Sequence, residues 1–157
     1  MYPIELILTS EESDIEIYTD GSMKNKATSE ITMGCAFIIS APIKHNFNCS
    51  IEDNPSSNKA ELMAVLLSIM VCSKAANVII YSDSQWVINI FGNLYYSTIN
   101  EIEKSKVNYK VLWLCLFKII GINNLKVRLI KVKAHSDCDY NKEVDILAKA
   151  GGEKTQY

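Results

Sequence analysis

Four acidic residues stand out because each occupies a position from which a carboxylate can reach a shared site. Asp20 and Asp83 come where short apolar stretches end, in IYTDGS and IIYSDSQW. Glu61 and Asp145 fall in the expected first turns of two helices, in SSNKAELMAV and NKEVDILAKAG. Four converging carboxylates would repel one another at neutral pH, and hard divalent cations with oxygen ligands relieve that repulsion. The pattern indicates a metal-dependent site that cleaves phosphodiester bonds.

Each acid also has an ordinary explanation. An aspartate after a strand is often a turn residue or a helix cap, and a glutamate in the first turn of a helix is favoured by the helix dipole. The metal-site hypothesis depends on all four acids being in the expected context at once.

The bulk composition fits one globular domain. The chain has 157 residues, of which 48% are hydrophobic and 22% charged, so we expect a single domain over 1–157 with its core at about 14–150. The formal net charge is −2. The four site acids account for more than that whole charge, so the charge balance does not exclude a nucleic-acid substrate.

Hydrophobic periodicity predicts the elements that must position the acids. Alternating or wholly apolar runs predict strands, and stripes at i, i+3, i+4 predict helices. A helix capped by Ser56 or Ser57 and closed by Asn77 follows the first three strands, whereas residues 93–106 show no clear pattern. The predicted strands are 14–20, 33–40, 46–51, 78–82 and 125–132, and the later helices are 83–92, 109–120 and 141–150.

The order βββ–α–β–α–α–β–α predicts an α/β fold. Three successive strands form an antiparallel meander, and the helix-connected strands extend it into a mixed five-stranded sheet with helices on both faces. The first and fourth strands should lie side by side in the centre. Their carboxyl ends would then present Asp20 and Asp83 at one edge, where open α/β sheets place their ligands.

The cysteines and the N-terminus bear on the cellular compartment. Five cysteines without regular spacing are typical of reduced, buried thiols in an intracellular protein. Cys138 lies near His135, but no second Cys or His pair completes a zinc set. Glu5 and Glu11 interrupt any early apolar run. We therefore expect a soluble cytoplasmic or nuclear protein, with no signal peptide and no membrane-spanning segment.

Five stretches together resemble the ribonuclease H family, meaning its type 1 enzymes and the ribonuclease H domains of retroelements. They occur in the family's order and at similar spacings, and they are more specific together than any one alone. The stretches are YTDGS at 18–22, NKAELMA at 58–64, YSDSQWVIN at 81–89, VKAHS at 132–136 and N-x-x-x-D-x-L-A at 141–148.

The resemblance implies a two-metal hydrolysis of the RNA strand of RNA–DNA hybrids, with two Mg²⁺ ions as cofactors and Mn²⁺ as an alternative. In such sites the ions stand about 3.5–4 Å apart. Asp20 matches the ligand that bridges both ions, and Asp145 matches the ligand of the ion that activates water. Glu61 and Asp83 match the ligands on the leaving-group side. His135 matches a residue that assists proton transfer or product release, which suits an imidazole.

The same resemblance implies substrate contacts. The 2′-hydroxyl read in the minor groove distinguishes RNA from DNA. Gly21 and Ser22 match contacts to the RNA strand, Asn58 and Gln85 match minor-groove contacts, and Ser56 matches a residue of the pocket that holds a DNA phosphate. Helix capping or simple solvation is the competing explanation for each of them.

Two regions depart from many cellular members of the family. The glycine- and proline-rich loop after the first aspartate is replaced by KNKATSEIT, and the basic protrusion is replaced by the short, mixed-charge segment 93–106. Such a reduced protrusion is typical of retroelement or viral domains. We therefore expect a monomer that binds RNA–DNA hybrids, with a reverse transcriptase or polyprotein as its further context.

Two other functions remain open at this level. An integrase- or resolvase-like nuclease shares the fold and the metal chemistry, but such families usually replace the last aspartate or differ in the motifs. A non-catalytic nucleic-acid-binding or assembly domain of a retroelement-type polyprotein would be favoured by loss of a carboxylate, and none of the four is lost.

Overall fold

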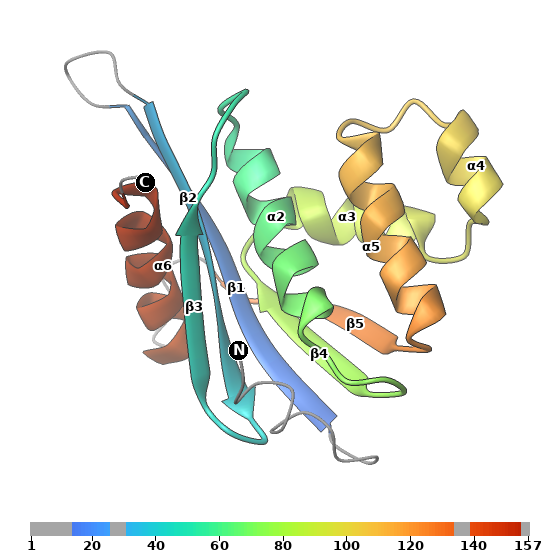
Figure 1. Cartoon of the computed structure of the whole chain (residues 1–157), viewed down its shortest axis with the longest axis horizontal. Coiled ribbons are helices and arrows are strands. Elements are labelled where there is room, and N and C mark those ends of the chain that lie inside the picture. Colours follow the sequence, from blue (N-terminus) through green and yellow to red (C-terminus); the bar gives the residue numbers. More distant parts are fainter. Residues whose placement is uncertain (1–13, 26–30, 134–138, 155–157) are drawn as a thin grey trace.

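The computed structural model describes residues 14–25, 31–133 and 139–154. Its elements follow the predicted order, with one additional short helix (Figure 1). They are β1 (Asp14–Asn25), β2 (Ile31–Ala41), β3 (His45–Ser50), α2 (Ser57–Met70), β4 (Asn77–Ser82), α3 (Gln85–Leu94), α4 (Ile99–Lys104), α5 (Lys110–Ile122), β5 (Lys126–Lys131) and α6 (Asp139–Gly152).

The five strands form one mixed sheet in the order β3-β2-β1-β4-β5. The pairs β1–β2 and β2–β3 are antiparallel, whereas β4 runs parallel to both β1 and β5. The predicted meander and the central position of the first and fourth strands are confirmed. The parallel pairing of β1 with β4 ends at Tyr18 and Tyr81, so the two strands separate at the edge where Asp20 and Asp83 lie.

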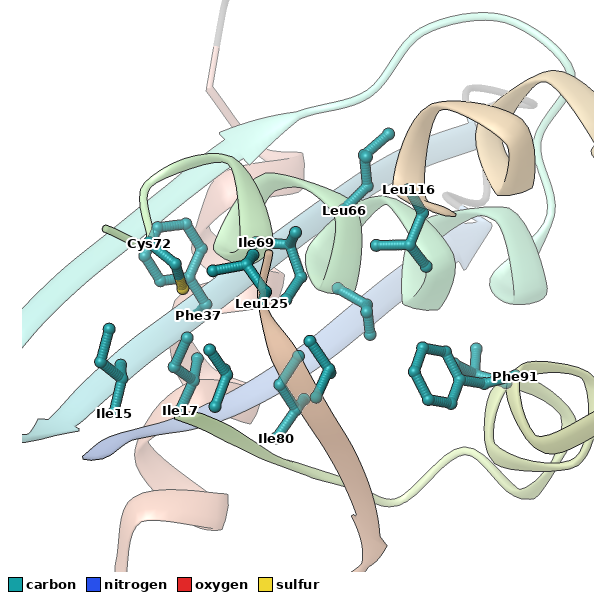
Figure 2. Close-up of a cluster of buried hydrophobic side chains, with 14 of the residues drawn as sticks. Ile15, Ile17, Phe37, Leu66, Ile69, Cys72, Ile80, Phe91, Leu116 and Leu125 are labelled. Carbon is teal, nitrogen blue, oxygen red and sulfur yellow. The ribbon is translucent and has the colours of Figure 1, made fainter. Parts of the chain in front are cut away.

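The larger core lies between the sheet and the helices α2, α3 and α5, which cover one face (Figure 1). Ile15, Ile17 and Ile80 supply the sheet side of this core, and Ile69 and Leu116 supply the helix side (Figure 2). All five side chains are fully buried. Burial of that apolar surface is the main stabilising term for such a layer.

Among the described residues, α6 is the helix that covers the opposite face of the sheet, over β1, β2 and β3 (Figure 1). Ala36 and Ile38 of β2 pack there against Val144 and Ala148. Helices therefore cover both faces, as predicted. None of the helices in the described part of the chain is long and apolar enough to cross a membrane.

The first strand is longer than predicted. Gly21 and Ser22 do not end β1, because its antiparallel ladder with β2 continues to the pair Asn25–Ile31. Asp20 therefore lies inside a strand, at the point where only one of its two neighbouring strands remains paired. The stretch between the predicted strands 14–20 and 33–40 therefore includes strand residues at both ends.

The helix boundaries also differ from the prediction. Asn77 does not close a helix: α2 ends at Met70 and a turn with Ala75 at φ 63° leads into β4. The segment 93–106 contains α4, whose Thr98 and Glu101 form a reciprocal capping box. That T-x-x-E signature is visible in the sequence. The helix was not predicted from periodicity because it has six residues and buries one side chain, that of Ile102, so it shows no apolar stripe.

Three glycines that follow the predicted helices 109–120 and 141–150 lie inside the observed helices. Gly121 belongs to α5, and Gly151 and Gly152 belong to α6. Close packing explains the second pair: a Cβ on Gly151 would lie 2.7 Å from the carbonyl oxygen of Cys49 on β3. The end of α6 is thus pressed onto the backbone of the sheet.

We expect Gly34→Ala to destabilise the fold. Gly34 on β2 faces α6, and an added Cβ would lie 2.2 Å from the nitrogen of Gly152 and 2.3 Å from the carbonyl oxygen of Ala148. These are backbone atoms, so relief requires moving α6 from the sheet, at a cost of about 1–3 kcal/mol. Urea unfolding measures the change.

Gly121→Ala is the matched control. It lies in a helix with no atom within 4 Å of an added Cβ, and alanine is the better helix former by up to about 1 kcal/mol. If the two variants had the same urea midpoint of unfolding, the close packing described for α6 would be contradicted.

Candidate active site

Asp20 is the most buried of the four acids. It lies in β1 opposite Ala36 of β2, and only 4% of its surface is exposed. A carboxylate so far from water is costly unless it is protonated or paired. The position of Asp20 therefore requires a compensating group nearby.

Glu61 is brought to Asp20 by the close approach of α2 to β1. A Cβ on Gly21 would lie 2.4 Å from both the carbonyl carbon of Ala60 and the nitrogen of Glu61. Only glycine admits this contact between helix and strand backbones. The backbone of Gly21 also hydrogen-bonds to Glu61. Glu61 stands in the second turn of α2, not in the first turn as predicted.

Asp83 follows β4 in a tightly bonded turn. The amide of Ser84 donates to Ser82 Oγ at 3.1 Å, and Ser84 Oγ accepts from the amide of Val87 at 3.2 Å, which caps α3. Ser84, and not Asp83, is therefore the N-cap. Lys131 Nζ, at the end of β5, donates to the main-chain carbonyl of Asp83. Because Ser84 caps α3, the Asp83 carboxylate is not used as the helix cap.

These three carboxylates form one cluster. One oxygen from each of Asp20, Glu61 and Asp83 lies within 4.8 Å of the other two. The three acids come from three different elements, so the cluster is a product of the tertiary fold.

Asp145 reaches the cluster from α6, on the other face of the sheet. Its carboxyl hydrogen-bonds to that of Asp20, and it also forms an ion pair of 2.8 Å with Lys149 one turn later. Asp145 lies in the second turn of α6 and is partly exposed. All four acids singled out by the sequence are therefore brought together, three of them as a tight group.

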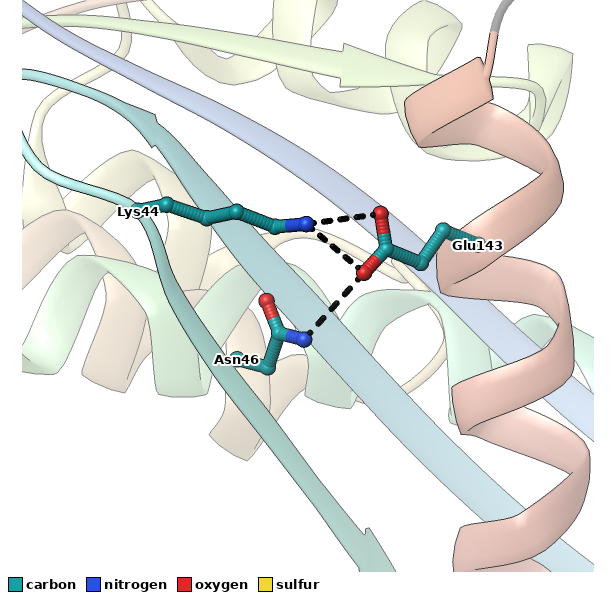
Figure 3. Close-up of polar contacts among 3 residues, drawn as sticks. All are labelled: Lys44, Asn46 and Glu143. Carbon is teal, nitrogen blue, oxygen red and sulfur yellow. Dashed lines mark hydrogen bonds and ion pairs between the residues drawn. The ribbon is translucent and has the colours of Figure 1, made fainter.

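A polar contact ties α6 to the edge of the sheet. Lys44 Nζ, just before β3, donates to the two carboxylate oxygens of Glu143 at 2.9 and 3.1 Å, and Asn46 donates to one of them at 3.3 Å (Figure 3). The contact with Lys44 lowers the pKa of Glu143. The contact is exposed, so it sets the orientation of α6 more than the stability of the protein.

The raised pKa values of Asp20 and Glu61 show that the cluster disfavours negative charge. Burial raises the pKa of Asp20 to about 7, and the charge of Asp83 adds to that effect. The pKa of Glu61 is raised well above its usual range by burial first and then by the charges of Asp20 and Asp83. Burial and like charge are the two influences that a bound cation would offset.

The donor set fits a hard divalent cation. Every group in the cluster is a carboxylate oxygen, the ligand type that Mg²⁺ and Mn²⁺ prefer. Glu61 Oε2 is buried and has no hydrogen-bond partner among the residues that the structure describes. A buried oxygen in this state is rare in folded proteins and needs an explanation. Ligation of a cation by Glu61 supplies one.

The residues predicted to contact substrate have mixed local roles in the structure. Ser56 Oγ caps α2 by accepting from the amide of Lys59 at 3.3 Å, as predicted for its capping role. Gln85 Nε2 donates to Asn89 Oδ1 at 2.7 Å along the exposed side of α3. Asn58 is partly exposed in the first turn of α2.

Two lysines of the site were missed by sequence reasoning, and one predicted residue lies elsewhere. Lys149 pairs with Asp145 at i, i+4, a spacing readable in the sequence, whereas the contact of Lys131 with Asp83 depends on the pairing of β4 with β5. His135 falls outside the described residues.

We expect the metal-free protein to lose stability between about pH 4 and pH 7. The pKa of Asp20 rises from an ordinary 3.8 to about 7 on folding. In that window the folded state retains a proton that the unfolded state has lost, so the free energy of unfolding falls as pH rises. Because one pKa unit corresponds to about 1.4 kcal/mol, a loss of at least about 1 kcal/mol is expected in urea unfolding with a chelator present.

Asp20→Asn should flatten this pH dependence, and Asp14→Asn should not. Asp14 begins the same strand and is exposed, so the pair of variants makes the same change inside and outside the cluster. The same slope in both variants would show that the cluster is not the source.

Comparison with known proteins gives a consistent result. The family model described as RNase H matches residues 12–153. A ribonuclease H from a Thermoanaerobacter species is 31% identical over 139 residues, which cover 85% of this chain and 86% of that protein. A ribonuclease H from Clostridium botulinum is 30% identical over 138 residues, covering 84% of this chain and 91% of its own.

Solved structures share the fold at lower identity. A foamy viral protease-reverse transcriptase in complex with an RNA/DNA hybrid matches with a TM-score of 0.72 and 16% identity, over 98% of this chain and 21% of that one. LC9-RNase H1, described as a type 1 RNase H with the type 2 active-site motif, matches with a TM-score of 0.71 and 17% identity, over 88% and 71%. With the family model matched over nearly the whole length, the chain belongs to the ribonuclease H family.

Proposed function

We propose that this protein is a metal-dependent endoribonuclease that hydrolyses the RNA strand of RNA–DNA hybrids. The observation that carries the proposal is the close group of buried Asp20 with partly exposed Glu61 and Asp83, whose oxygens lie within 4.8 Å of one another, in a member of the ribonuclease H family. A structural role does not account for the raised pKa values of Asp20 and Glu61, which burial and the neighbouring charge of Asp83 cause. A site for divalent cations does.

We further propose two Mg²⁺ ions, with Mn²⁺ able to replace them. Asp20 interacts with Glu61 and Asp83 on one side and with Asp145 on the other, so it is the acid placed to share both ions. Glu61 and Asp83 would hold one ion, and Asp145 would hold the other. When bound, such ions would supply polarisation of the scissile phosphate and activation of the attacking water.

The chain's own residues would orient this chemistry. The Gly21 contact with Glu61 and the Ser82–Ser84 turn before α3 hold two of the carboxylates in place before substrate arrives. Such preorganisation is worth a large factor in rate, since small misplacements of a catalytic group are costly. Lys149, which pairs with Asp145, would give up that contact when a cation binds.

Substrate recognition is proposed for the residues around the acids. Gly21 and Ser22 would contact the RNA strand, and Asn58 and Gln85 would read the minor groove. Ser56 would bind a DNA phosphate: its oxygen accepts the capping bond from Lys59, and its hydroxyl proton still can be donated.

The cellular context is also a proposal. We infer a single-domain monomer in the cytoplasm or nucleus, and a reverse transcriptase or polyprotein as the wider setting. The support for the second point is the shared fold with a foamy viral protease-reverse transcriptase, together with the short segment 93–106 between α3 and α5.

Cleavage of a labelled RNA–DNA hybrid tests the function. With Mg²⁺ or Mn²⁺ present, we expect the RNA strand of the hybrid to be cut, and single-stranded RNA and duplex DNA to be spared. Cleavage of duplex DNA would favour an integrase- or resolvase-like nuclease. Hybrid binding without any cleavage would favour a non-catalytic binding domain.

Asp83→Asn should abolish hybrid cleavage, with a loss of at least about 10³-fold in kcat, because the lost charge is a metal ligand and contributes to the stabilisation of developing charge. Folding should be unaffected, since Asp83 makes no core contact. Asp14→Asn, exposed at the far end of β1, is the control and should retain normal turnover. Near-normal turnover of Asp83→Asn would refute the site.

His135→Ala should slow turnover by about 10²-fold or less, on the scale of general acid–base catalysis. The expected cause is loss of a group that transfers protons near neutral pH. The measurement is the pH profile of kcat in both proteins. A profile identical in height and shape would contradict this role.

A further inference from the structure

Two cysteines face each other across neighbouring strands near the acidic site. Cys35 of β2 is the direct register partner of Cys49 of β3, and their Sγ atoms are 3.5 Å apart. Cys35 also pairs across the other side with Gly21 of β1, the residue next to Asp20. No step of the proposed hydrolysis uses either thiol.

The backbone geometry at this pair suits a disulfide. The amide of Ile51 donates to the carbonyl of Met33 at 2.8 Å, which marks that register pair as hydrogen-bonded. Hydrogen-bonded and non-hydrogen-bonded pairs alternate along an antiparallel ladder, so Cys35 and Cys49, two pairs further on, are again hydrogen-bonded. Cα atoms in such pairs are about 5.5 Å apart, inside the range of about 4.4–6.8 Å found in disulfides. The expected Cα spacing of the pair therefore falls within the span of a disulfide, and closure requires the two Sγ atoms to approach from 3.5 Å to about 2.05 Å.

The two thiols differ in exposure and in pKa, and these differences determine which of them reacts first. Cys35 is fully buried, whereas Cys49 is partly exposed. The contact with Cys35 lowers the pKa of Cys49, and the same contact together with burial raises the pKa of Cys35. Cys49 is therefore the thiol that an external oxidant meets first, and Cys35 is the resolving partner behind it.

We propose that Cys35 and Cys49 form a site of reversible thiol oxidation, closed by a small disulfide such as oxidised glutathione. The Cys49 thiolate attacks one sulfur of the oxidant, forming a mixed disulfide and releasing one thiolate. Cys35 then attacks Cys49 Sγ, loses its proton to solvent or to the released thiolate, and expels the second thiol. Two protein thiols are oxidised, and one disulfide is reduced to two thiols.

The bridge would join the edge strand β3 to β2 where α6 rests on both. Gly151 lies against the backbone of Cys49, and Gly34, next to Cys35, lies against the end of α6. Closing the chain between two such residues stabilises the folded state, chiefly by constraining the unfolded chain. The oxidised protein should unfold at a higher temperature than the reduced protein.

Mass spectrometry of the full chain tests the proposal. After incubation with oxidised glutathione and blocking with N-ethylmaleimide under denaturing conditions, the protein should lose two hydrogens and two of its five alkylation sites. Lys44 lies between the two cysteines, so trypsin should yield peptides 27–44 and 45–59 joined by the bridge. Dithiothreitol should separate them and lower the unfolding temperature again.

Single variants assign the bridge. Cys49→Ser, at the partly exposed position, should abolish the joined peptides and the rise in unfolding temperature, and Cys115→Ser should retain both, because Cys115 is exposed on α5. Cys138→Ser should also retain both. Absence of the joined peptides in the wild type, or their loss in Cys138→Ser, would overturn the assignment. Disulfide formation requires no nuclease activity, so the outcome is independent of the hybrid assay.

Discussion

Repulsion among closely spaced carboxylates is the physical constraint on which the candidate site and its surroundings depend. Asp20 is 4% exposed and shares its surroundings with Glu61 and Asp83, an arrangement that destabilises the charged forms of Asp20 and Glu61. A fold retains such a cluster when something offsets its cost. In the proposed function a divalent cation would offset this cost, so the repulsion among the acids would favour cation binding.

The fold meets this constraint through close contact between backbones. Gly21 lets α2 touch β1, and Gly34 and Gly151 let α6 lie directly on the other face of the sheet. Helices from both faces thus deliver Glu61 and Asp145 to the same strand. The edge contact of Lys44 with Glu143 supports the orientation of α6 (Figure 3). The part of β1 that carries Asp20 is therefore packed between α2 and α6. The facing thiols of Cys35 and Cys49 lie in the neighbouring ladder of β2 and β3.

Much of this was predictable from local patterns. Within the described part of the chain, periodicity identified the five strands and four of the five helices, because buried faces repeat every two or 3.6 residues. The four acids were identified by their motifs, and the structure brings them together. Boundaries were less predictable. The extension of β1 past Gly21 depends on pairing with β2, and α4 was missed because it buries a single side chain, Ile102. The expectation of buried cysteines was wrong for Cys115, which is exposed on α5.

The sequence by itself determined the order of elements, the family and the identity of the acids, because those depend on residue types and on spacing along the chain. Tertiary structure alone decided which groups touch. Three features depend on segments that are separate in the sequence. They are the packing that buries Asp20 and raises its pKa, the hydrogen bond from Lys131 to Asp83, and the pairing of Cys35 with Cys49. Strand register and helix docking set those distances, and no local periodicity encodes them.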